Sequence, residues 1–178
     1  AMPQTLFTLI LFDVAALVYA LALGLGLSDA VSVRDHLLAG MLASVLIIFT
    51  HVLVIFYLIG TGMDIREAVE EDDALVKKYV LFTRRLKKKV FPLACFATLL
   101  IIVASLLGAE VHSRLIPAPG AETALPLRQV GGWWVHLVFS SLALCVNAAA
   151  FVAEFRAVRK NREAIEAINE WALNGRGG

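Results

Sequence analysis

Residues 37–62 read LLAGMLASVLIIFTHVLVIFYLIGTG and contain no Asp, Glu, Lys or Arg. About 20 apolar residues in a helix span the hydrocarbon of a bilayer, and the backbone must be helical there because lipid offers it no hydrogen-bond partner. This stretch is long enough to cross a membrane. Its one histidine, His51, lies near the middle.

Three further stretches have the same character. The chain of 178 residues is 60% hydrophobic and only 17% charged, whereas soluble domains are roughly one quarter charged. The apolar segments are residues 5–27, 37–62, 90–109 and 133–153. Pro92 falls in the first turn of the third segment, where proline is tolerated. We therefore expect an all-α fold, a polytopic membrane four-helix bundle that forms a single integral membrane domain.

Basic residues lie mainly on one side of the predicted spans. Thirteen of the sixteen follow the second or the fourth span, namely Arg66, Lys77, Lys78, Arg84, Arg85, Lys87, Lys88, Lys89, Arg156, Arg159, Lys160, Arg162 and Arg176. The other two loops hold Arg34, Arg114 and Arg128. Because cytoplasmic loops carry the excess of Lys and Arg, we expect both termini in the cytoplasm, with the bacterial inner membrane as the location.

The charged segments 63–89 and 154–173 retain apolar residues at helical intervals. They are predicted to be cytoplasmic helical extensions of the second, third and fourth helices, with the chain turning back between Tyr79 and Arg85. The basic run Arg84, Arg85, Lys87, Lys88 and Lys89 is placed to meet anionic lipid headgroups, which argues against nucleic-acid binding. A second copy of the chain or another membrane subunit is a possible partner of the helical extensions.

Ionisable groups at membrane depth are costly, so each is a candidate functional residue. Asp13 and His51 are two such groups, about 8 Å apart in predicted depth. A contact between them would orient the imidazole. The polar residues at broadly similar depth are Thr50, Thr98 and Asn147, which would complete an intramembrane polar site. The alternative is that Asp13 and His51 only hold two helices together.

A haem site is the second functional hypothesis. His51 and His136 lie on spans that run in the same direction, offset in predicted depth by about 7.5 Å. Two histidines on facing helices of a bundle can hold a haem. The absence of CxxCH makes any haem a non-covalent b type. In outline, four spans with an intramembrane histidine resemble the small membrane cytochromes.

His36, His112 and His136 are all predicted near outer helix ends. Three imidazoles could bind zinc or copper. The HxH or HxxxH spacing that would fix ligand geometry is absent, so the sequence assigns no metal ligand. Taken together, the sequence favours a non-enzymatic membrane subunit, scaffold or small transporter with an intramembrane polar site. The alternative is a b-type haem electron carrier ligated by His51 and His136.

Overall fold

The computed structural model describes residues 2–26, 33–114 and 131–175, and these residues are helical apart from short turns. The long helices are α1 (Met2–Leu25), α2 (Val33–Val69), α4 (Leu81–Ser113) and α5 (Trp133–Gly175). Two short elements join α2 to α4, namely α3 (Asp73–Leu75) and the π-helical η1 (Val76–Val80). The described part of the chain contains no strand.

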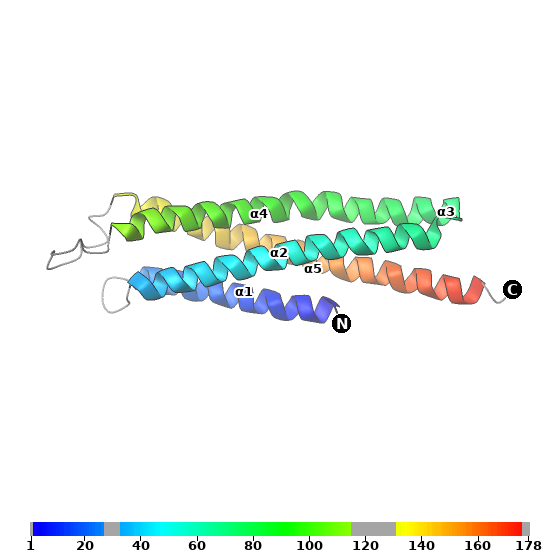
Figure 1. The fold of residues 1–178 in the computed structure, drawn as a ribbon, viewed down its shortest axis with the longest axis horizontal. Helices are drawn as coiled ribbons and strands as arrows, with labels where there is room; N and C mark the ends of the chain where they lie inside the picture. The colour runs from blue at the N-terminus through cyan, green and yellow to red at the C-terminus, as the bar shows by residue number, and fades with distance from the viewer. Residues whose placement is uncertain (1, 27–32, 115–130, 176–178) are drawn as a thin grey trace.

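The long helices lie side by side in an elongated arrangement, each running opposite to the one before it (Figure 1). α1 packs on α2 and α5, α2 packs on α4 and α5, and α4 packs on α5. α1 is the shortest of the four, so α2, α4 and α5 extend beyond its N-terminus toward α3. At the opposite end the chain passes from α1 to α2 and from α4 to α5. We call this the α1–α2 end, and the other the α3 end.

The helices pack through positions that recur with a seven-residue period. In α1 the buried residues are Leu6, Asp13 and Ala20. In α4 a buried series alternates steps of four and three residues, and it comprises Val90, Ala94, Ala97, Ile101, Ala104, Gly108 and Val111. This is the spacing by which neighbouring helices interlock side chains along a common seam. Small residues in the α4 series allow the backbones to approach closely.

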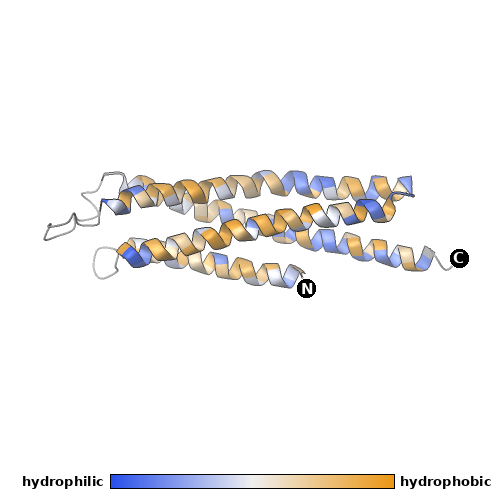
Figure 2. Ribbon diagram, in the orientation of Figure 1, coloured by the Kyte–Doolittle hydropathy of each residue, from blue (hydrophilic) through white to orange (hydrophobic). Residues whose placement is uncertain are grey.

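The outer faces of the long helices are apolar. Phe12, Phe56, Leu106 and Val138, one from each long helix, are 66%, 68%, 67% and 56% exposed. Soluble monomers rarely expose apolar patches of this extent. All four helices are long and apolar enough to cross a membrane. Apolar residues dominate them over much of their length, and polar residues become frequent toward the α3 end (Figure 2).

The turn between α2 and α4 lies earlier than the sequence predicted. α2 ends at Val69, and the side chain of Asp72 caps the next helix by accepting hydrogen bonds from the backbone N–H groups of Ala74, at 2.8 Å, and Leu75, at 3.0 Å. The residues from Tyr79 to Arg85, where a turn was expected, are helical. The turn thus forms without Gly or Pro, and Asp72 caps the start of the helix that follows it.

The helix boundaries also correct the position of Pro92. Because α4 begins at Leu81, Pro92 lies in its interior rather than in its first turn. The backbone nitrogen of proline carries no hydrogen, so it cannot donate to a carbonyl in the preceding turn. By contrast, α2 and α5 continue as helices well beyond residues 62 and 153, where the predicted spans end, and the sequence predicted such helical continuations.

Candidate functional site

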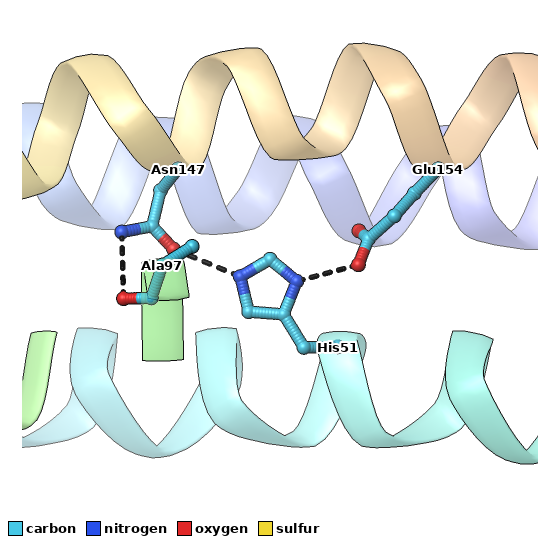
Figure 3. Close-up of polar contacts among 4 residues, drawn as sticks. All are labelled: His51, Ala97, Asn147 and Glu154. Carbon is cyan, nitrogen blue, oxygen red and sulfur yellow. Dashed lines mark hydrogen bonds and ion pairs between the residues drawn. The ribbon is translucent and has the colours of Figure 1, made fainter. Parts of the chain in front are cut away.

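His51 is fixed at both ring nitrogens by side chains of α5 (Figure 3). Its Nδ1 lies 2.7 Å from Oε1 of Glu154, and its Nε2 lies 2.9 Å from Oδ1 of Asn147. The ring of Phe151 stacks on the imidazole with centroids 5.1 Å apart. His51 is 1% exposed, and Glu154 and Asn147 are each 0% exposed. One face of α5 therefore contacts the imidazole with three of its side chains.

The amide of Asn147 determines the tautomer of His51. Its Nδ2 donates to the carbonyl of Ala143 at 2.7 Å and lies 3.5 Å from that of Ala97. Carbonyl oxygens only accept, so the NH₂ group must face them and Oδ1 must face His51. Nε2 of His51 then has to be the donor. The hydrogen bond between Nδ1 of His51 and Glu154 is therefore the one in which a proton can move from one residue to the other.

A second carboxyl group lies at the same level. Asp13 on α1 is 1% exposed and close enough to His51 and Glu154 to interact with both electrostatically. The Thr50 hydroxyl lies beside the Asp13 carboxyl without the geometry of a hydrogen bond. The predicted proximity of Asp13 and His51 is therefore present. The closest carboxyl group to His51, however, is that of Glu154 and not that of Asp13.

Several buried oxygen atoms at this level have no hydrogen-bond partner among the described residues. They are Oδ2 of Asp13, Oγ1 of Thr50 and Oε2 of Glu154. A fourth unpartnered oxygen, Oδ1 of Asn161, lies two turns further along α5. More than nine in ten buried polar groups in native structures are partnered, so such a cluster needs an explanation. We refer to Asp13, Thr50, His51, Asn147 and Glu154 as the central polar site.

The sequence identified four of these five residues and missed Glu154. It predicted Glu154 to be the first residue after the fourth span, at the start of a charged helical segment. A signal was nevertheless available. Asn147, Glu154 and Asn161 recur every seven residues and therefore share one face of the helix. Thr98, the remaining predicted member, is half-buried on α4 and makes no hydrogen bond to the central polar site.

The structure does not bring His51 and His136 together. The ring of His136 lies 6.1 Å from that of His36. His36 precedes His51 by fifteen residues on α2, or about 22 Å of helix. Both nitrogens of His51 are also hydrogen-bonded. This arrangement offers no common iron site to the two predicted haem ligands.

His136 instead joins His36 and His112 at the α1–α2 end. His36 begins the second turn of α2, His112 lies at the last turn of α4, and His136 begins the second turn of α5. One nitrogen from each ring lies within 4.8 Å of the others. The sequence considered this trio as a metal site and assigned no ligand. The tertiary structure supplies the proximity that the sequence spacing lacked.

The chain matches no protein-family model, no curated protein and no solved structure.

Proposed function

We propose that the chain is a non-enzymatic integral membrane protein, a four-helix bundle that carries protons through its central polar site as a small proton-coupled transporter. The membrane setting is supported by the four apolar helices and by the large apolar side chains on their outer faces. Burying such faces in lipid removes them from water. Charged and polar groups then occupy the interior of the protein, where they are shielded from lipid.

The proposed orientation places the α3 end in the cytoplasm. Most described Lys and Arg residues lie near that end, as the positive-inside rule requires of cytoplasmic segments. Two of the basic residues counted in the sequence, Arg128 and Arg176, lie outside the described residues. In this orientation the bundle has its N-terminus and C-terminus on the cytoplasmic side.

Anionic headgroups are the proposed partners of the basic run at the start of α4. Arg84, Arg85, Lys88 and Lys89 are exposed, so their charged groups can reach the bilayer surface. Lys87 differs from them. It is half-buried, and its Nζ lies 2.7 Å from where a Cβ on Gly62 would be.

Proton transport is supported above all by the unpartnered oxygens around a histidine held at both nitrogens. A purely structural polar contact in a bundle interior would satisfy its own atoms, since each buried unpaired group costs about 1–3 kcal/mol. Here two carboxyl groups and a hydroxyl retain free acceptor atoms next to His51. Such atoms can bind a proton or an entering water. Intramembrane Asp, Glu and His residues are the usual proton carriers of pumps and transporters.

The charges of the site make it prone to exchange protons. With both Asp13 and Glu154 ionised and His51 neutral, the site would carry two negative charges in a medium of low dielectric constant. It is neutral only when it holds two more protons. Those protons can be on the two carboxyls, or on one carboxyl and the imidazole. The two arrangements differ by a proton transfer across the 2.7 Å bond between Glu154 and His51.

A proton flux assay tests the proposal. The purified chain is reconstituted into liposomes that contain a pH-sensitive dye, and a potassium diffusion potential is imposed. We expect wild-type protein to change the internal pH faster than empty liposomes do. Glu154→Gln should abolish this flux, because the amide can still donate to Nδ1 of His51 but has no proton to give up. Asp13→Asn removes the second carboxyl and should have the same effect.

Ser44→Ala is the matched control. Ser44 lies two turns from His51 on the same helix and shares a 2.8 Å hydrogen bond with Ser105, so its loss removes a half-buried polar contact outside the site. This variant should keep wild-type flux. The proposal is wrong if wild-type liposomes match empty ones, or if Glu154→Gln and Asp13→Asn, both eluting as folded protein in detergent, match wild type.

A further inference from the structure

The histidine trio, His36, His112 and His136, presents three rings to one another at the α1–α2 end. The ring centroids of His36 and His112 are 4.6 Å apart, and those of His112 and His136 are 5.4 Å apart. His36 and His112 are 9% and 2% exposed. The rings come from α2, α4 and α5, so three helices converge to form the cluster. This site is distinct from the central polar site.

Each ring has the same nitrogen occupied by a backbone carbonyl. The contacts are those of Nδ1 of His36 with Ala20 at 2.9 Å, of His112 with Gly108 at 2.6 Å, and of His136 with Ala104 at 3.1 Å. A carbonyl accepts and never donates, so each Nδ1 must carry the hydrogen. In a neutral imidazole the lone pair is then on Nε2. The Oγ of Ser140 also lies 3.3 Å from Nδ1 of His136, and it can accept from the same N–H.

Because each Nδ1 carries its hydrogen, the three Nε2 lone pairs have no hydrogen-bond donor among these rings, and one nitrogen from each ring lies within 4.8 Å of the others. A cation resolves this, and the observed pattern is the one that metal-binding histidines use. Such residues typically donate their other ring N–H to a carbonyl or carboxylate, which fixes the tautomer and the ring orientation. Here all three histidines already have that arrangement.

Two glycines make room for the rings. A Cβ on Gly24 would lie 2.7 Å from Cε1 of His36, and a Cβ on Gly108 would lie 2.7 Å from Cε1 of His136. Both separations are shorter than side-chain packing allows. The absence of a side chain at these positions therefore leaves the space that two of the three rings occupy. Gly40, by contrast, has nothing within 4 Å of its Cβ position.

We propose that the histidine trio binds a divalent first-row metal ion, Zn²⁺ or Cu²⁺, through three Nε2 atoms. Neutral imidazoles suit these ions. With nitrogens at the observed limit of 4.8 Å, a central ion would lie about 2.8 Å from each, and ring shifts of about 0.7 Å bring this to the usual Zn–N distance. No fourth Cys, His, Asp or Glu in the described ranges joins the group. The fourth position of a tetrahedral ion is left to water or to an incoming ligand.

Metal titration of the purified full-length chain tests the proposal. The protein in detergent is first stripped with a chelator, and Zn²⁺ and then Cu²⁺ are added in competition with a chromophoric indicator. We expect one ion per chain for at least one of the two metals. Replacing all three histidines with alanine should remove this binding, and His51→Ala should leave it intact because His51 lies about 22 Å along α2 from His36.

The glycine variants test whether metal binding depends on the orientation of the rings and not only on the presence of three histidines. Gly108→Ala keeps all three ligands and displaces the His136 ring, so its affinity should fall by about 10–100-fold, the usual effect of losing ligand orientation. Gly40→Ala is the matched control and should bind like wild type. The proposal is overturned if wild type binds neither ion more tightly than the triple histidine variant, or if Gly108→Ala binds as tightly as Gly40→Ala. Neither result depends on proton flux.

Discussion

His51 and Glu154 form the one side-chain ion-pair contact that the described residues bury completely. The pair is separated by 2.7 Å, and Asn147 holds the opposite nitrogen of the ring. Oε2 of Glu154 remains unpartnered, so the contact is only partly compensated by its surroundings. Replacing one residue of the pair should therefore change the free energy of unfolding by a different amount from replacing both.

Substitution of this pair should be strongly non-additive. Glu154→Leu leaves Nδ1 of His51 buried without a partner, which we expect to reduce the free energy of unfolding by about 1–3 kcal/mol. In the double variant with His51→Phe, no unpaired group remains at this bond but Oδ1 of Asn147 loses its donor, so the total loss should be smaller than the sum of the two single losses. Unfolding of the reconstituted protein by SDS titration measures the four states of the cycle. A double variant as unstable as the sum of the single variants would contradict the assignment.

The connection between α2 and α4 depends on one aspartate. Asp72 accepts hydrogen bonds from two backbone N–H groups of α3, and this cap stabilises the start of the returning chain. The buried residues Ile65, Val69, Val80 and Ile168 pack behind it. The cap and this small apolar cluster together set the length of the helical extension.

Asp72→Ala should loosen this turn without unfolding the protein. Loss of an N-cap costs about 1 kcal/mol, and the effect should stay local because the main core clusters lie elsewhere on the helices. Hydrogen exchange followed by mass spectrometry should show faster exchange in residues 72–80 and little change in residues 90–110. Glu71→Ala, which removes an exposed neighbouring charge, is the control and should exchange like wild type.

Along most of its helices the molecule has an apolar exterior, and its largely apolar interior includes several buried polar side chains. Large apolar side chains cover the outside of the helices, and the buried side chains include Asp13, His51, Asn147 and Glu154. Such an apolar exterior is unusual for a soluble protein, and it suits a protein surrounded by lipid.

The proposed orientation can be tested with single cysteines. In a background of Cys95→Ala and Cys145→Ala, Glu163→Cys lies on the part of α5 near the α3 end, and Glu110→Cys lies near the α1–α2 end; both positions are exposed. A membrane-impermeant maleimide should label Glu110→Cys in intact bacteria, but Glu163→Cys only after the inner membrane is permeabilised. The reverse pattern would invert the topology. Recovery of the chain in soluble form without detergent would exclude the membrane setting.

The number and approximate position of the long helices could be predicted from the sequence. A span requires about 20 apolar residues in succession, which is a local property that each segment shows by itself. The same holds for the uneven distribution of Lys and Arg. Asp13, Thr50, His51 and Asn147 were found because a polar residue inside an apolar segment is conspicuous in the sequence.

Only the tertiary structure decided which polar residues meet. The predicted depths assumed that Asp64 and Glu154 end their helices at one level. In the structure Glu154 lies beside His51, which is thirteen residues, or about 20 Å, from Asp64. That displacement separates His51 from His136 and brings His136 to His36 and His112. The axial offset and rotation of one helix against another arise from side-chain packing along the whole seam, and no single segment of the sequence contains them.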